Sequence, residues 1–550
     1  MRLTGLSLIA ARRFAETAGG ARILRQKVFS DYKIHDLLNL PPEARAPLAI
    51  HAGPLAQTRR RGWSGKDLAL GKSPDHVVSA AELRRAYTAG ETTPVEVLRA
   101  IRERVESGEF GQATFSPFTC LDFDIATEAA EKSAARYAAG EPLGPLDGIP
   151  LPVKDQYIMK GLPVGCGSAY RDEIYQHDAH VVEVLRDAGA LIYAKTHTTE
   201  WGMNPCGFCS HRTLPRNVYS SDHSAGGSST GAAVAIALGL APIATGSDGG
   251  GSIRIPAAMN ALYGIKPTYV RLGRTGDLFG SSSVTAAGPL AATTSDLVDF
   301  MAAFGDVTDP ADPARRWGPT PRNLADRFRR ALGRGVDGAR IGIPRSEWDD
   351  LDPALQQPSL DALKELERDG AELVDLDAPL LRHAPAVGVI SIGLECVANL
   401  QDEFALYQEA FGDELRMSLA MLRTVDATEF LASQRTRAAL QVAMRDHLDE
   451  VDLIALPTTQ TTASEYPADL DGVPIADDVA LRAMTRYTFL ANITGLPAGS
   501  VPVGFHQGLP FGLQFVGGAW DEASIFAAMA HAERQQWAEI PAPQGLHSLL

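Results

Sequence analysis

Helix signals recur along the first half of the chain, ahead of its glycine-rich centre. Ser79 and Glu82 form a capping box, and Thr93 precedes a proline at the first helical position. Two further segments each stop at a glycine, the residue that most often ends a helix. We therefore expect helices that begin near residues 80 and 94, and helices over 124–139 and 178–188.

Short apolar runs alternate with these helices. The runs are Ile149–Val153, Leu191–Ala194 and Pro242–Thr245, and an alanine-rich helix over 229–240 precedes the last of them. Short apolar runs between helical segments are typical of buried strands. Their alternation with helices predicts an α/β fold.

Residues 305–338 separate this half from the next. They are rich in proline, arginine and aspartate with little apolar periodicity, and we interpret them as a surface excursion. Strand-like runs follow at Arg340–Pro344 and Val451–Leu456, and helical spacing dominates 385–447. We predict one α/β domain with a mixed central sheet flanked by helices. Two independent cores joined only by 305–338 would contradict this prediction.

The composition is that of an ordinary globular protein. Of 550 residues, 45% are hydrophobic and 21% are charged, which suffices for a large core without metals or disulfides. The formal net charge of -16 argues against a nucleic-acid partner, because a surface that follows phosphates needs a clustered basic excess. No uninterrupted apolar run is long enough for a membrane-spanning helix.

The N-terminal region has the opposite charge to the rest. Residues 1–60 hold ten Lys or Arg against four Asp or Glu, with apolar positions at loosely helical spacing. We predict a helical arm over 1–75 ahead of one domain over 76–550. The favoured interpretation is an arm packed on its own domain, since surface helices are usually amphipathic. Contact of residues 1–60 with a membrane surface or with a partner stays open, and a homodimer is a separate possibility.

Cysteine usage and the N-terminus both suggest a cytoplasmic protein. The chain has five cysteines, an odd number that does not resemble a secreted disulfide framework. Arg12 and Arg13 lie where a signal-peptidase site would need small neutral residues. Cys206 and Cys209 form a C-x-x-C without a second half, so we predict neither a metal nor a cofactor.

Two glycine-rich loops carry the strongest chemical signal. Ala225–Gly231 contains Ser228, and Gly246–Pro256 contains Ser252. Glycines let such loops approach a ligand closely and aim several N–H groups at one point, as an oxyanion hole requires. The candidate N–H donors are those of Gly249, Gly250, Gly251 and Ser252.

These loops and one other segment also match, in part, the motifs of other protein classes, but the surrounding residues that those motifs require are missing. Neither loop has the lysine of a phosphate-binding loop or the spacing of a dinucleotide fingerprint. Gly227–Gly231 matches the G-x-S-x-G nucleophile elbow around Ser229, but the preceding residues 216–224 are polar where an elbow needs a buried strand. Ser30–Lys33 matches S-x-x-K, but it lies in the basic arm. We take these matches as incidental.

A serine nucleophile needs a base, and the sequence places none of its 13 histidines beside the loops. Lys154 is the candidate, because it ends an apolar run that would carry its side chain inward, and burial lowers the pKa of an ammonium group. From the residues alone, a strand-end lysine paired with Asp155 is the commoner arrangement.

Several ordered blocks together resemble the amidase signature family. The three principal blocks are Leu146–Pro150 with Val153–Asp155, Gly226–Ser229, and Gly250–Pro256. Further blocks are Asp178-Ala179, Ala188–Ala190, Gly264–Thr268, Gly288-Pro289, Asn492–Pro497 and Gly508–Gln514. The resemblance covers about residues 80–535, with the signature core at about 146–300.

This resemblance implies the amidase signature fold and a serine amidohydrolase that cleaves C–N bonds other than peptide bonds. It implies a triad in which Lys154 is the base, Ser228 is a relay in a cis peptide, and Ser252 is the nucleophile. Asp248 and Arg254 resemble partners that hold the loop.

Departures from the family pattern bear on the substrate. Gly249 stands where many members have Thr, and Ile255 stands where amidotransferase subunits often have Gln. These residues and the long arm resemble the fatty-acid-amide-hydrolase-like branch. We therefore expect a small-molecule amide with a hydrophobic acyl or aryl group.

We expect a variable region over about 380–480 to shape the substrate pocket, with Met203 and Ser229 as further contacts. Its apolar side chains are core residues in the commoner arrangement. The alternatives are a glutaminase subunit of an aminoacyl-tRNA amidotransferase, and a non-catalytic binding scaffold. The apolar residues considered for the pocket are Trp201, Ile390, Leu394, Phe404, Leu406, Phe411 and Leu422.

Overall fold

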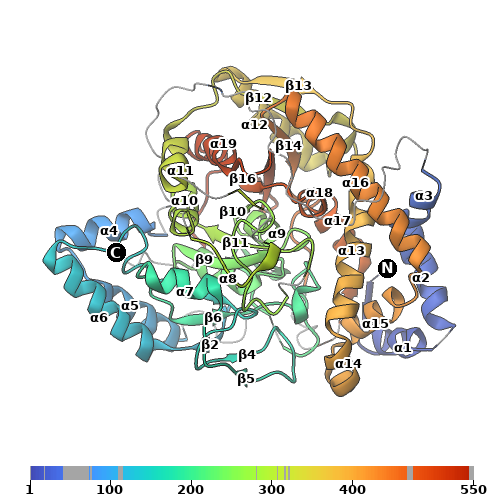
Figure 1. Ribbon diagram of the computed structural model, residues 1–550, viewed down its shortest axis with the longest axis horizontal. Helices are drawn as coiled ribbons and strands as arrows, with labels where there is room; N and C mark the ends of the chain where they lie inside the picture. The colour runs from blue at the N-terminus through green and yellow to red at the C-terminus, as the bar shows by residue number, and fades with distance from the viewer. Residues whose placement is uncertain are drawn as a thin grey trace.

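A computed structural model describes most of the chain (Figure 1). The residues it describes are 2–17, 19–40, 63, 74, 77–108, 115–212, 214–279, 282–305, 307–314, 318–319, 323–466, 473 and 475–543.

An eight-stranded mixed sheet forms the centre of the fold, in the order β13-β12-β14-β17-β16-β10-β11-β9. β12 pairs in parallel with β13 and β14, and every other neighbouring pair is antiparallel. The strands are β9 (Ile243–Asp248), β10 (Tyr263–Lys266), β11 (Ala286–Ala291), β12 (Arg340–Ile343), β13 (Glu372–Asp375), β14 (Leu453–Pro457), β16 (Ala498–His506) and β17 (Leu509–Gly517).

Helices cover both faces of this sheet. Successive side chains of a strand point to opposite faces. A Cβ added at Gly499 of β16 would meet Met529 of α19 (Glu522–Arg534), and one added at Gly512 of β17 would meet Ala258 of α9 (Arg254–Met259). Gly499 and Gly512 lie on opposite faces, because Gly499 pairs with Phe515. The predicted mixed sheet flanked by helices is confirmed.

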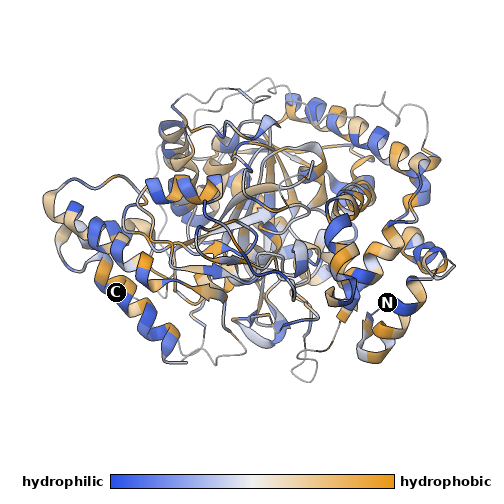
Figure 2. Ribbon diagram, turned by 60° about the horizontal axis from the view of Figure 1, so that its bottom comes forward, coloured by the Kyte–Doolittle hydropathy of each residue, from blue (hydrophilic) through white to orange (hydrophobic). Residues whose placement is uncertain are grey.

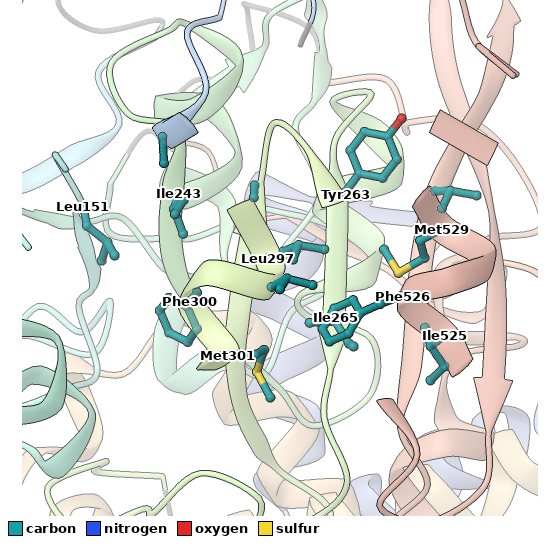
Figure 3. Packing of buried hydrophobic residues seen from close by; sticks show 14 of the residues in the cluster. Leu151, Ile243, Tyr263, Ile265, Leu297, Phe300, Met301, Ile525, Phe526 and Met529 are labelled. Atoms are coloured by element: carbon teal, nitrogen blue, oxygen red, sulfur yellow. The ribbon is translucent and has the colours of Figure 1, made fainter. Parts of the chain in front are cut away.

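One hydrophobic core runs through both halves of the chain. Its largest cluster joins Leu151, Ile243 and Phe300 to Phe526 and Met529 across the sheet (Figure 3). The two halves also share the sheet, since β10 from the first half pairs with β16 from the second. The alternative of two independent cores is therefore wrong.

The helices predicted from caps and glycine stops are present, with small shifts in their bounds. Ser79 and Glu82 make the expected capping box, and Gly140 ends its helix with φ 73°. These helices are α4 (Ala80–Ala89), α5 (Pro94–Glu106), α6 (Phe123–Ala139) and α7 (His180–Asp187), and the predicted alanine-rich helix is α8 (Thr230–Ala237). Figure 2 shows that helices around the sheet carry both hydrophobic and hydrophilic residues, whereas all of α8 is buried.

The predicted surface excursion over 305–338 is wrong in part. Within it, α11 (Leu324–Gly333) packs against α10 (Thr294–Ala303) and α19. Leu324, Phe328 and Leu332 recur at helical spacing and are buried. Basic residues between them hide this short apolar stripe in the sequence.

A second sheet has three strands in the order β2-β6-β3, and its strand β3 ends at Lys154 of the candidate site. Its strands are β2 (Phe118–Leu121), β6 (Ala194–Thr196) and β3 (Val153–Lys154). The predicted strand Ile149–Val153 is thus shorter and shifted, and only a bridge from Pro150 to Leu191 lies ahead of β3.

The second half adds helices of the variable region, namely η5 (Leu381–His383), α13 (Ala384–Asn399), α14 (Gln401–Tyr407), α15 (Asp413–Leu422) and α16 (Ala427–Glu450). Beyond that region lies α18 (Phe489–Thr494). Within the described residues, Leu381–Asn399 is the one helical segment long and apolar enough to cross a membrane by length and composition, and 61% of its most apolar stretch is buried inside the protein. The burial of this segment in the protein core explains its apolar composition.

The N-terminal residues form β1 (Arg2–Thr4), α1 (Gly5–Ala15), α2 (Gly20–Asp31) and α3 (Ile34–Leu38). α1 and α2 pack on α15, α3 packs on α16, and β1 pairs with β15 (Ile475–Asp477). Figure 1 shows the three helices on the flank beside α15 and α16. The arm boundary predicted between residues 75 and 76 lies outside the described residues.

Candidate active site

Lys154 points from the end of β3 toward the serine loops. Its side chain is fully buried, and its Nζ donates hydrogen bonds of 2.8 Å to Ser228 Oγ and of 2.8 Å to Ser247 Oγ. Asp155 instead pairs with Lys195, at 2.7 Å from Oδ1 to Nζ. Asp155 lies in the turn that follows β3, and its carboxylate binds Lys195 there. The arrangement in which these two form a pair is therefore wrong.

Ser228 lies in the loop between the hairpin strand β8 (Ser220–Ser224) and α8. The Gly227-Ser228 peptide bond is cis, as the resemblance implies. Gly202 packs over the Ser228 hydroxyl, because a Cβ added at Gly202 would lie 3.2 Å from Oγ. The hydroxyl is thus enclosed between Lys154 and Gly202.

Ser229 joins the two serine loops. Its N–H donates to the Ser252 carbonyl oxygen at 3.3 Å, and its Oγ lies 3.4 Å from both the backbone nitrogen and the carbonyl oxygen of Ser247. The side chain is fully buried. The strand ahead of it, β8, belongs to a two-stranded hairpin, so the buried strand that a nucleophile elbow requires is not there.

The loop between β9 and α9 is held by a buried ion pair. Arg254 donates from Nε to Asp248 Oδ2 and from Nη2 to Asp248 Oδ1, both at 3.0 Å, and it also reaches Asn492 and Gln514. Burial acts to raise the pKa of Asp248, but Arg254 outweighs it and lowers that pKa to about 2. Asp248 and Arg254 therefore have the loop-holding position that the resemblance implies.

The four predicted oxyanion donors are not equivalent. The Gly251 N–H donates to Asp248 Oδ1 at 2.7 Å, so this donor is already occupied and its prediction is corrected. In the part of the chain that the structure describes, the N–H groups of Gly249, Gly250 and Ser252 have no hydrogen-bond partner. Ser252 itself is 6% exposed. Three donors thus remain in the loop that carries Ser252.

Burial dominates the electrostatics of Lys154. It lowers the pKa of the Lys154 ammonium to about 7, against the opposing influence of Asp277, Asp248 and Cys166. A lysine with this pKa is largely neutral in mildly alkaline solution. It can then accept a proton.

Three polar residues beside Lys154 were missed by sequence reasoning. Ser247 Oγ donates to Gln156 Oε1 at 2.7 Å, and Gln156 Nε2 donates to Asp277 Oδ1 at 2.7 Å. Ser247 lies within the Gly246–Pro256 loop already singled out, and Gln156 lies two positions after Lys154, so both were within reach of sequence reasoning. Asp277 is 121 positions from Gln156, and no pattern in the sequence connects the two.

The walls around the glycines are mostly apolar. A Cβ added at Gly249 would lie 2.7 Å from Ile392 Cδ1 and 2.9 Å from Thr285 Oγ1. One added at Gly250 would lie 2.6 Å from the ring of Phe489. Real side chains do not fit at these distances, so glycine is required for the loop to approach α13 and α18.

The apolar residues considered for the pocket differ in how far they are buried. Trp201, Phe404 and Phe411 are buried in one cluster, with Met203 partly buried at its edge. Ile390 and Leu422 are also buried, Leu394 is partly buried, and Leu406 is 74% exposed. Contact of Met203 or Ser229 with a substrate stays a prediction.

No site for a metal emerges from the described residues, since none of their His, Cys, Asp and Glu side chains cluster in groups of three or more suited to an ion. Cys206 and Cys209 are both buried with free thiols.

Comparison with known proteins identifies the family. The amidase family model matches residues 96–526. A curated relative, the A subunit of the glutamyl-tRNA(Gln) amidotransferase of Halorhodospira halophila, is 34% identical over 477 residues, which cover 82% of this chain and 95% of the relative. A solved bacterial aryl acylamidase of the amidase signature family has a TM-score of 0.75 and 25% identity, with 86% of this chain and 100% of that chain covered. The native peptide amidase of Stenotrophomonas maltophilia has a TM-score of 0.70 and 27% identity, with 85% and 98% covered. The chain therefore belongs to the amidase signature family.

Proposed function

We propose that this amidase signature hydrolase cleaves an amide through an acyl-enzyme on Ser252. The observation that carries the proposal is the buried Lys154, whose Nζ lies 2.8 Å from Ser228 Oγ and whose pKa burial lowers to about 7. A neutral lysine in contact with a serine is an activated proton acceptor. The hydrogen bond from Ser229 to Ser252 supports the placement of Ser252 beside Ser228.

In the acylation step, Ser252 Oγ bonds to the amide carbon while its proton passes to Ser228 Oγ, and the Ser228 proton passes to Lys154 Nζ. The N–H groups of Gly249, Gly250 and Ser252 are the donors offered to the negative oxygen that forms. The C–N bond then breaks. The leaving nitrogen takes a proton from Ser228, which the Lys154 ammonium replaces.

Deacylation uses the same groups in the same order. A water molecule gives its proton to Ser228 as its oxygen bonds to the acyl carbon, and Ser228 again passes a proton to Lys154. The bond to Ser252 Oγ breaks, the carboxylic acid leaves, and the proton returns to Ser252.

For the substrate, the walls of the site support an amide with an apolar acyl or aryl group. Ile392 and Phe489 border Gly249 and Gly250, and the nearby charges of Asp248 and Arg254 neutralise each other. An apolar acyl chain would gain by leaving water there, at up to about 0.8 kcal/mol per methylene.

A second candidate is a glutaminase that works with partner subunits in an amidotransferase. The curated relatives favour it over an apolar-amide hydrolase, since the Halorhodospira halophila relative and others at similar identity are A subunits of glutamyl-tRNA(Gln) amidotransferases. Gly249 and Ile255 are the departures that point the other way. The fatty-acid-amide-hydrolase-like branch stays a prediction.

Kinetics of the purified chain separate the two candidates. We expect kcat/KM on p-nitroanilides to rise severalfold from acetyl to decanoyl, because each buried methylene adds to transition-state binding. Glutamine, assayed as released ammonia, is the matched polar substrate. A flat or falling anilide series together with ready glutamine hydrolysis would support the glutaminase and contradict the apolar substrate.

A further inference from the structure

A continuous hydrogen-bonded chain leads from Lys154 to a buried carboxylate that the proposed mechanism does not use. Lys154 Nζ donates to Ser247 Oγ at 2.8 Å, and Ser247 Oγ donates to Gln156 Oε1 at 2.7 Å. Gln156 Nε2 in turn donates to Asp277 Oδ1 at 2.7 Å. All four side chains are buried, so water does not interrupt the chain.

Asp277 fixes the direction of every bond in this chain. Its Oδ1 accepts both the Phe279 N–H, at 2.9 Å, and the Gln156 amide, so this oxygen acts as an acceptor. The NH₂ end of Gln156 must therefore face Asp277, and its Oε1 must face Ser247.

Ser247 then has a single possible role toward Lys154. A serine hydroxyl has one proton, and this one is committed to Gln156 Oε1. Ser247 Oγ can consequently only accept from Lys154 Nζ. A neutral lysine that spends an N–H on Ser247 is oriented so that its lone pair is free for the Ser228 hydroxyl.

We propose that Asp277 is a positioning residue, which acts through Gln156 and Ser247 to aim the proton-accepting lone pair of Lys154 at Ser228. This role rests on the proposed function. The hydrogen bonds of Asp277 go to Gln156 and to the Phe279 N–H, so its directional effect on Lys154 passes through the intervening side chains.

The charged groups near Lys154 and Asp277 determine how each variant should change the pH dependence of activity. Asp277, Asp248 and Cys166 all favour the charged form of Lys154. Burial raises the pKa of Asp277, while its hydrogen bonds and the cations Lys154 and Arg274 favour its charged form. Loss of the Asp277 charge therefore lowers the pKa of Lys154.

Two variants separate the charge of Asp277 from its directional role. Asp277→Leu removes both the charge and the acceptor oxygen, so it should move the acid limb of the kcat/KM profile to lower pH and reduce the plateau at least about tenfold, part of the roughly 10²–10⁴ that a positioned base supplies. Gln156→Met breaks the chain but keeps the Asp277 charge. It should reduce the plateau similarly while the acid limb stays near the wild-type pH.

Thermal unfolding and circular dichroism verify that each variant folds, and Gln156→Met carries the test if Asp277→Leu does not fold. Plateau activities within twofold of wild type in a folded variant would overturn the proposal. Ser252→Ala provides the separate check on the mechanism itself. If Ser252→Ala is inactive while the Asp277 and Gln156 variants keep wild-type activity, only the role of Asp277 is wrong.

Discussion

A lysine becomes a base only after it has lost its proton, and the position of Lys154 explains how this chain arranges that loss. Full burial disfavours the ammonium form, while Ser228 and Ser247 keep the amine hydrogen-bonded. The buried carboxylate that follows it directly in the sequence, Asp155, is diverted to Lys195. Lys154 is therefore left without an ion pair to its sequence neighbour at the point where proton transfer is needed.

The pH dependence of activity follows from this position. The pKa of Lys154 is lowered to about 7, and only the neutral amine accepts a proton. We expect kcat/KM for an anilide to rise as pH increases through about 7 and to level off above it. Steady-state kinetics between pH 5 and 9 provide the measurement. A profile that falls over this interval would contradict the assignment of Lys154 as the base.

The adjacent serines of the first loop provide a matched pair. Ser228 Oγ touches Lys154, whereas Ser229 Oγ makes only two long bonds, of 3.4 Å, to the backbone of Ser247. Ser228→Ala should lower kcat/KM by roughly 10²–10⁴, the usual contribution of a positioned proton-transfer group. Ser229→Ala should lower it less than about tenfold. The reverse order of effects would favour Ser229 as the functional hydroxyl.

At the scale of elements, the N-terminal helices are tied to the helices of the variable region. Arg12 of α1 binds Asp413 of α15 at 2.7 Å, and Arg25 of α2 binds Glu429 of α16 at 2.7 Å. Leu8 is fully buried between α1 and α15, beside Met417. Helices α1 and α2 thus brace the layer that also contains Ile392.

Leu8 and Leu6 test this attachment, because they lie on opposite sides of one helix. Leu8 is 0% exposed and Leu6 is 85% exposed. Leu8→Asp buries an unpaired carboxylate and should cost several kcal/mol of α1 docking, roughly the 2–5 kcal/mol of a lost buried leucine or more. Limited proteolysis should then cut the arm faster than in wild type. Leu6→Asp is the control, and equal cleavage of both variants would show that α1 does not depend on this contact.

For the whole molecule, the alternation of strands and helices was enough to predict an α/β fold, because each apolar run between caps has few ways to become buried. Lys154 could be placed inward for the same reason. The mixed sheet belongs to the fold that the family resemblance implies. The partner of Lys195 could not be predicted, since it depends on a tertiary contact. The apolar stripe of α11 was missed because it is short and basic residues interrupt it. The hydrogen bond from Gln156 to Asp277 joins distant segments of the sequence, and a single sequence does not reveal such tertiary contacts.

The need for partner subunits also distinguishes the two candidate functions. A stand-alone hydrolase needs only this chain, whereas a glutaminase subunit would need partners. Membrane contact, homodimer formation and cytoplasmic location stay predictions, as does the boundary of the N-terminal arm.

The central claim is the acyl-enzyme on Ser252, and covalent labelling tests it most directly. The chain is treated with a serine-directed fluorophosphonate, digested, and mapped by mass spectrometry, with anilide turnover measured in parallel. We predict a single adduct on Ser252 in wild type and in Ser229→Ala, and neither adduct nor turnover in folded Ser252→Ala, since a lost nucleophile typically costs several orders of magnitude. An adduct on Ser229 or elsewhere, or substantial turnover by Ser252→Ala, would contradict the account.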